Sequence, residues 1–297
     1  MSRRPAFGLG LAAAGALFLT PDALFMRWSE MDGFQMTAWR GLLMGSVMML
    51  GWALLSRDRG GDLAQLASRP GLAIVGCQFL NSTLFCLGIA SAPAAVVLFG
   101  VAAVPVFSAV LSRVIMGEPT RLATWAAMAA VMVGIGISVS GGKGEEVGLN
   151  LRALAGAAFG LGVAAVLALN FVILRARPGL PIPLVIGLGA WAAGLNGLAI
   201  TGVGAMTDGH PWAMAVTGCI ILPVSFFTLS LASRHTQAAN VSLLMLLETV
   251  LAPLWVWMGV GERPTVNMAI GGAIVVTSLA IYLIVTGRGL RPKQAHG

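Results

Sequence analysis

The stretch that decides the fold is Arg234–Gly287, which reads RHTQAANVSLLMLLETVLAPLWVWMGVGERPTVNMAIGGAIVVTSLAIYLIVTG. It contains two apolar runs, each long enough for one membrane crossing, joined by a turn at Gly261–Thr265. Glu248 is the one charged residue inside the first run. A carboxyl group in the middle of a membrane helix is costly, so Glu248 needs a structural or functional reason.

A similar arrangement of apolar helix, Gly-Glu turn with a following Pro-Thr, and second apolar helix occurs earlier in the chain. The matching residues, at a constant offset, are Ala94, Ala95, Val97, Gly117 and Glu118 in the first copy and Ala238, Ala239, Val241, Gly261 and Glu262 in the second. The chain therefore reads as a duplicated unit of five helices.

The composition requires lipid as the solvent. Of the 297 residues, 58% are hydrophobic and 10% are charged, whereas soluble domains carry about 25% charged residues. The formal charge of +7 lies in loops, where it sets membrane orientation, so no nucleic-acid partner is expected. The three cysteines fall in apolar runs without metal-ligand spacing, so neither a disulfide framework nor a metal site is expected.

Ten segments are apolar and long enough to span the bilayer, which predicts an all-α polytopic membrane protein. We place them near 6–26, 34–56, 71–90, 94–116, 121–140, 151–173, 183–204, 210–232, 238–259 and 265–286. The predicted organisation is a first repeat over 1–140, an inter-repeat loop over 141–150, and a second repeat with a short tail over 151–297.

The distribution of Lys and Arg predicts the orientation. Most of the 18 positive residues fall on the side of the N-terminus, which places both termini in the cytoplasm of a bacterial inner membrane. Because each repeat crosses the membrane five times, the second repeat must be inverted relative to the first. Inverted repeats place a binding site near the midplane and allow alternating access from the two sides.

Three short motifs carry a family resemblance. They are Trp39-Arg40-Gly41, Gly117-Glu118-Pro119-Thr120 and Gly261-Glu262-Arg263-Pro264-Thr265. In this order, on ten helices, they resemble the drug/metabolite transporter superfamily in its ten-helix EamA-type branch. The resemblance implies export of small metabolites, often amino acids, between two bundles.

The Thr20-Pro21-Asp22 break in the first helix and the short tails look like the YddG-like exporters of aromatic amino acids and methionine. One position departs from the family pattern. A proline common just after the glutamate of the ninth helix is Thr249 here, and the nearest proline is Pro253.

Polar, charged and aromatic residues inside the predicted helices are the candidates for the substrate site. They are Thr20, Asp22, Trp39, Arg40, Gln78, Asn81, Ser82, Phe99, Asn170, Trp191, Glu248 and Tyr282. Candidate hinges or helix breaks are Pro21, Pro105 and Pro253. Pro21 removes a helix hydrogen bond and would leave the carbonyl of Leu17 without its partner.

Two of these candidates have opposite charges at similar predicted depths. Asp22 and Arg40 could form an ion pair that fixes the first helix against the second, or could bind the charged groups of a zwitterion. Glu248 lies near the midplane. It could be a protonated carboxyl bonded to a neighbouring helix, or a proton-coupling or ammonium-binding group.

The sequence favours a secondary transporter that exports amino acids or similar small amphipathic metabolites. It contains no Walker loop and no hydrolase motif, so neither a catalytic residue nor a cofactor is expected. The rival within transport is an exporter of drugs or quaternary cations. Rivals from other classes are an intramembrane enzyme and a structural or receptor subunit. The expected partners are the lipid bilayer and the solute, and a monomer is plausible.

Overall fold

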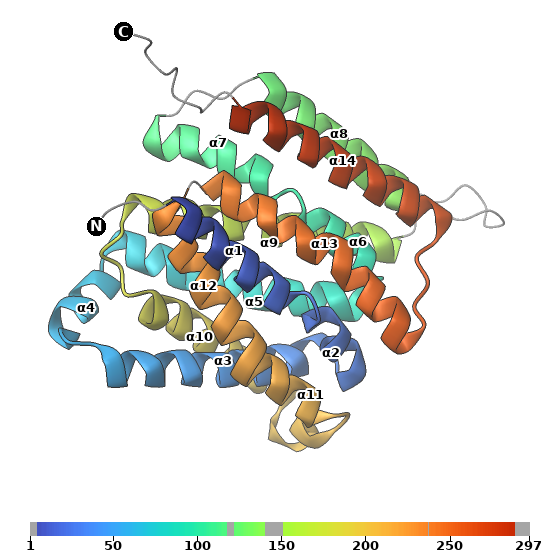
Figure 1. Cartoon of the computed structure of the whole chain (residues 1–297). Coiled ribbons are helices and arrows are strands. Elements are labelled where there is room, and N and C mark those ends of the chain that lie inside the picture. The colour runs from blue at the N-terminus through green and yellow to red at the C-terminus, as the bar shows by residue number, and fades with distance from the viewer. Residues whose placement is uncertain (1–4, 118–121, 140–150, 237, 289–297) are drawn as a thin grey trace, which may run out of the picture.

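The computed structural model describes residues 5–117, 122–139, 151–236 and 238–288. Within these ranges all regular elements are helices, and no strand is present. The helices pack side by side, and α1 (Pro5–Leu19) begins at the same end of the bundle at which α14 (Val266–Arg288) ends (Figure 1).

The remaining helices follow the predicted spans closely. In the first predicted repeat they are α2 (Asp22–Ser29), α3 (Gly33–Leu55), α4 (Arg59–Leu66), α5 (Arg69–Ser91), α6 (Ala94–Val101), α7 (Val104–Met116) and α8 (Leu122–Val139). In the second they are α9 (Leu151–Ala176), α10 (Ile182–Thr201), the 3-10 turn η1 (Val203–Thr207), α11 (Pro211–Val216), the π-helical turn η2 (Thr217–Ile221), α12 (Leu222–His235) and α13 (Ala238–Val260). The short helix α4 occupies a connection for which the sequence predicted no helix.

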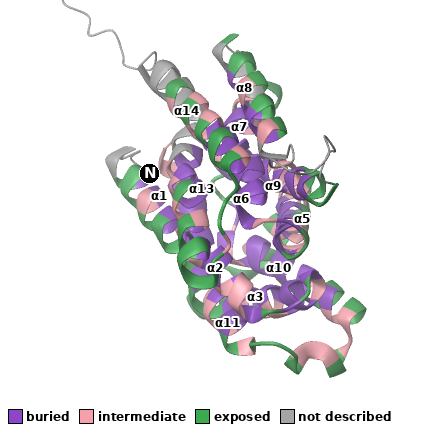
Figure 2. Cartoon of the chain, turned by 90° about the vertical axis from the view of Figure 1, so that its right-hand side faces the viewer, coloured by how far each residue is buried: buried purple, intermediate pink, exposed green. Residues whose placement is uncertain are grey.

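The described part of the chain is an all-α, polytopic membrane protein. Seven of its helical segments are long and apolar enough to cross a membrane, and shorter apolar stretches coincide with the predicted fifth, ninth and tenth spans. Large apolar side chains such as Leu54, Leu122 and Val133 are exposed, as on a surface that faces lipid. Buried residues concentrate in the middle, around α5, α6, α9, α10 and α13 (Figure 2). The count of ten spans stays a prediction.

Two of the predicted spans are broken helices. α1 ends at Leu19 and α2 begins at Asp22, so the chain turns at Thr20 and Pro21. The expected loss of a partner for the Leu17 carbonyl is wrong, because Thr20 supplies both its backbone N–H at 3.3 Å and its hydroxyl at 2.9 Å.

The fourth span is likewise divided between α6 and α7, and the ninth is not. Pro105 lies in the first turn of α7, just after the break at Ala102 and Ala103. Pro253 instead lies inside the continuous helix α13, so the break expected there is wrong. Neighbouring helices commonly hold a membrane helix together where a proline removes one backbone hydrogen bond.

The pairing of helices is the pattern that two exchanged repeats would give. α3 packs against α10 and α8 against α14, while α5 packs against α9 as α1 packs against α12. In the predicted repeats α9, α10, α12 and α14 are the counterparts of α1, α3, α5 and α8. Exchanging each helix with its counterpart reproduces these pairs. The pairing supports the inverted repeat, which stays a prediction because the inter-repeat segment 141–150 lies outside the described residues.

The closest of these pairings, α3 with α10, depends on glycine. A Cβ atom added to Gly41 would lie 2.5 Å from the carbonyl oxygen of Ala190 and 2.5 Å from the backbone nitrogen of Gly194. Because both neighbours are backbone atoms, the helices would have to move apart. Lipid gives no hydrophobic drive for helix association, so close backbone packing of this kind is a main source of stability.

We therefore expect Gly41→Ala to lower the free energy of unfolding by about 2 kcal/mol through overpacking. Gly51→Ala is the matched control on the same helix, because nothing lies within 4 Å of its added Cβ. Thermal unfolding of the purified protein in detergent measures both. Equal melting temperatures for the two variants would show that the α3–α10 contact is not tight.

Candidate substrate-binding cavity

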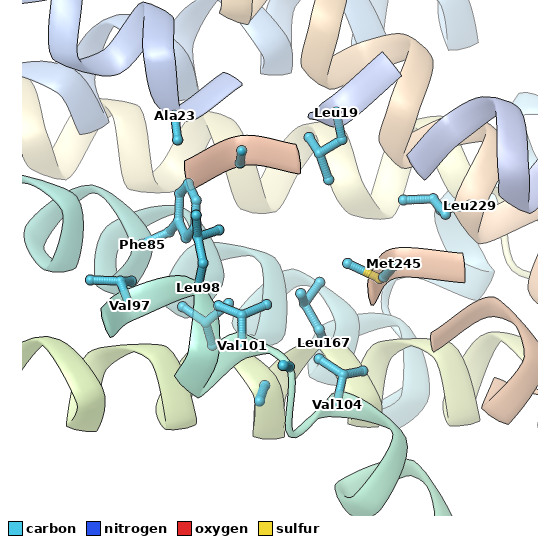
Figure 3. Packing of buried hydrophobic residues seen from close by; sticks show 14 of the residues in the cluster. Leu19, Ala23, Phe85, Val97, Leu98, Val101, Val104, Leu167, Leu229 and Met245 are labelled. Carbon is cyan, nitrogen blue, oxygen red and sulfur yellow. The ribbon is translucent and has the colours of Figure 1, made fainter. Parts of the chain in front are cut away.

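A narrow cavity lies in the middle of the bundle, between helices of both predicted repeats. Its polar lining consists of Asp22, Arg40, Gln78, Asn81, Ser82 and Glu248. Its apolar lining includes Leu19, Val101, Leu167, Leu222, Phe226 and Met245, and Figure 3 shows several of these side chains converging. The volume open to the centre of a water molecule is about 30 Å³. Water fits this space, whereas an organic solute requires side chains or helices to move.

Asp22 and Arg40 form the ion pair that the sequence suggested. Arg40 Nη1 donates to Asp22 Oδ1 at 2.7 Å, and Arg40 Nη2 donates to Asp22 Oδ2 at 2.8 Å. Asp22 is 1% exposed and Arg40 is 6% exposed. The guanidinium also lies 5.7 Å from the centroid of the Phe85 ring. This bidentate geometry joins α2 to α3 and neutralises both charges.

The Trp39-Arg40-Gly41 motif has a separate contact for each residue. Trp39 donates its indole N–H to the carbonyl oxygen of Met206 at 2.8 Å. Arg40 reaches Asp22 across the cavity, and Gly41 allows α10 to approach. Consecutive residues of a helix point about 100° apart, so one short motif fixes α3 against three different elements.

Glu248 is the cavity carboxyl without a direct partner. It is 4% exposed and belongs to the cavity lining. Among the described residues no group forms a hydrogen bond or an ion pair with it. It is nevertheless close enough to attract Arg40 and to repel Asp22 electrostatically. A buried carboxyl of this kind is available to bind a cationic group or a proton.

The three polar candidate residues of α5, namely Gln78, Asn81 and Ser82, all line the cavity. Gln78 Nε2 donates to Ser82 Oγ at 3.1 Å and approaches Met44 Sδ at 4.0 Å. Gln78 Oε1 is buried and has no partner among the described groups. Asn81 also lines the cavity and is 6% exposed. The cavity therefore contains unused acceptors, namely Gln78 Oε1 and the Glu248 carboxyl.

The other candidate residues lie outside the cavity lining. Thr20 stabilises the break between α1 and α2, and its hydroxyl accepts from Trp255 Nε1 at 3.3 Å. The Phe99 ring lies against Gly272 of α14. Trp191 is 36% exposed and donates to Ser46 Oγ at 3.2 Å.

The last two candidates are Asn170 and Tyr282. Asn170 is buried on α9, one turn beyond the cavity residue Leu167, and its Oδ1 has no partner among the described groups. Tyr282 lies in α14, but its side chain is outside the described residues.

A charged contact between the two predicted repeats could not be located from the sequence. Arg27 at the end of α2 forms an ion pair with Glu262, which follows α13, at 2.9 Å. A signal was present, because the predicted first span (6–26) ends just before Arg27 and the predicted ninth span (238–259) ends just before Glu262, which places both residues on the same side of the membrane. Opposite charges on one side are common, however, and the sequence does not tell which of them meet.

Comparisons with known proteins indicate a family for part of the chain. Residues 6–140 match the model of the EamA-like transporter family. The comparison with curated proteins gave no match. Among solved structures 14 chains match. One of them, described as "Crystal structure of protein", is 18% identical with a TM-score of 0.67 and covers 98% of this chain and 100% of that chain. At this identity the likeness shows the fold alone.

Residues 6–140 thus resemble the EamA-like transporter family, which is placed in the drug/metabolite transporter superfamily. This family indicates a multi-pass membrane transporter of the drug/metabolite type and not an enzyme. The comparisons give no evidence for the narrower YddG-like group.

Proposed function

We propose that this protein is a secondary transporter that exports small amphipathic metabolites bearing an amino group, with amino acids as the first candidates. Transport would proceed by alternating access through the cavity between two inverted repeats, in a bacterial inner membrane with both termini in the cytoplasm. The observation that carries the substrate class is the division of the cavity into an apolar part and a part with one unpaired carboxyl, Glu248.

The charges around the cavity favour an ammonium group. Asp22 and Arg40 cancel each other, and an ionised Glu248 leaves one uncompensated negative charge. A bound amine would neutralise this negative charge. A zwitterion would leave the net charge of the cavity unchanged, and a simple carboxylate would add a second negative charge. Uncompensated buried charge costs several kcal/mol. The amino group of the solute therefore belongs beside Glu248, and its apolar part beside Leu167, Phe226 and Met245.

A second candidate function rests on the same unpaired carboxyl. Export of organic cations or cationic drugs would also use Glu248 as the counter-charge, with the apolar wall in contact with the rest of the molecule. The two candidates differ in what they require of the solute: an amino-acid exporter accepts a carboxylate near the Asp22–Arg40 pair, and a cation exporter does not.

Substrate protection tests whether the solute occupies this cavity. In a variant without native cysteines, Ser82→Cys introduces a thiol into the lining and Trp191→Cys introduces one outside it. We expect saturating phenylalanine or phenethylamine to slow thiol labelling at position 82 and to leave position 191 unchanged. Protection at position 191 alone, in a protein that transports the ligand, would place the substrate elsewhere.

A further inference from the structure

Groups from both predicted repeats meet at the end of the bundle where α2 ends and α13 leads into α14. Arg27 Nε lies 2.9 Å from Glu262 Oε2 as an ion pair, without the alignment of a hydrogen bond. The same guanidinium donates through Nη2 to Glu262 Oε1 at 3.3 Å and to the carbonyl oxygen of Ala92 at 2.7 Å. Glu262 Oε1 also accepts the backbone N–H of Ala94 at 2.9 Å.

Glu262 therefore caps a helix of the other repeat. Ala94 is the first residue of α6, and the first N–H groups of a helix have no partner within it. A carboxylate at this position also interacts favourably with the helix dipole. Gly261 ends α13 with a φ of 73°, a left-handed conformation that glycine adopts without strain and that begins the turn to Glu262.

The contact is placed so that it can open. The side chains of Arg27 and Glu262 are 23% and 29% exposed, so water can replace each partner. Beside the pair is a hollow of about 140 Å³ bounded by Pro93, Ala94, Thr265 and Met268. The buried contact of Leu24 with Gly259 and the hydrogen bond from Trp28 Nε1 to the Gly259 carbonyl also join α2 to α13, and they would have to break when the repeats separate here.

The two elements that Glu262 joins also form walls of the cavity. α2 begins at the cavity residue Asp22 and reaches Arg27 between one and two helical turns later. α6 begins at Ala94 and ends at the cavity residue Val101. A movement that separates Arg27 and Ala94 from Glu262 therefore also moves the cavity walls.

We propose that the contact among Arg27, Glu262 and Ala94 is a latch that holds this end of the transport pathway closed and breaks when the cavity opens to that side. By the predicted orientation this is the outer side of the membrane. The latch controls access to the cavity and acts in the same way whichever solute the cavity carries.

Accessibility of the cavity tests the latch without any substrate. Ser82→Cys, in a variant without native cysteines, is labelled by a membrane-impermeant thiol reagent added on the Arg27 side. We expect Arg27→Gln and Glu262→Gln each to raise the labelling rate by about threefold to tenfold, as the loss of a partly exposed, charge-assisted contact allows. Asp208→Asn at the same end, where the side chain is exposed and forms no ion pair with the described residues, serves as the matched control and should leave the rate unchanged.

An unchanged labelling rate in both latch variants would overturn the proposal. Cross-linking gives the opposite test, with Arg27→Cys and Glu262→Cys combined in the cysteine-free variant. A short bifunctional methanethiosulfonate that bridges the two thiols should reduce exchange of phenylalanine or phenethylamine across proteoliposomes at least about tenfold, and a reductant should restore it. A cross-linked protein that transports at the parent rate would also refute the latch. Because labelling needs no solute, a failure of the proposed substrate class leaves its result intact.

Discussion

Replacing Arg40 by glutamine is expected to destabilise the protein by about 3–5 kcal/mol, because removal of one partner leaves a buried charge unpaired. Two carboxyl groups, those of Asp22 and Glu248, would then share the cavity without a cation. Asp22→Asn should cost less, because Arg40 keeps an electrostatic partner in Glu248. The asymmetry between the two variants is specific to this arrangement of three charges.

The double variant Asp22→Asn with Arg40→Gln distinguishes a structural pair from a binding pair. It removes both charges, keeps the side-chain shape at position 22 and shortens the side chain at position 40, so the free energy of unfolding in detergent should return to within about 1–2 kcal/mol of the parent value. If the pair is structural, this variant also transports. If the folded double variant fails to transport, the pair contacts the solute. Single variants that are as stable as the parent would contradict the burial of this ion pair.

The second large effect is expected at Glu248. We expect Glu248→Gln to raise the dissociation constant for an amphipathic primary amine at least about tenfold, because it loses a charge-assisted hydrogen bond of about 1.5–3 kcal/mol. The melting temperature should stay near that of the parent, because Glu248 has no direct partner among the described residues. Binding is measured by calorimetry in nanodiscs.

Asp208→Asn is the control for Glu248→Gln, because Asp208 is an exposed carboxylate between η1 and α11, outside the cavity lining. It should bind the amine as the parent does. Unchanged affinity in Glu248→Gln would show that the unpaired carboxyl is not the ammonium site. Loss of folded protein would show instead that Glu248 is structural.

Much of the fold could be predicted from the sequence, because lipid allows few solutions. Each apolar run must form a helix to satisfy its backbone, and the seven segments long and apolar enough to cross a membrane lie within a few residues of predicted spans. Local breaks were harder to predict. Thr20 makes the break at Pro21 inexpensive by bonding to the Leu17 carbonyl, whereas α13 continues through Pro253. Composition does not distinguish these two prolines.

The charged part of the cavity was also predictable, and the uncharged part was not. Asp22, Arg40 and Glu248 attract attention because a charge in lipid needs compensation. An aromatic residue carries no such signal on a helix that is apolar on all sides. Phe99 and Trp191 were expected near the substrate, yet Phe99 packs against Gly272 and Trp191 is partly exposed. Which face of a uniformly apolar helix points inward depends on its neighbours.

The central claim is that an unpaired Glu248 selects the amino group of an amphipathic solute. Binding of three matched ligands to the parent protein in nanodiscs tests it most directly: phenethylamine, phenylalanine and phenylpropionate share a ring, and differ in their charged groups. We expect phenethylamine to bind at least as tightly as phenylalanine, and phenylpropionate, without an amino group, to bind at least about tenfold more weakly than either. Phenylpropionate binding as tightly as phenethylamine would contradict the account.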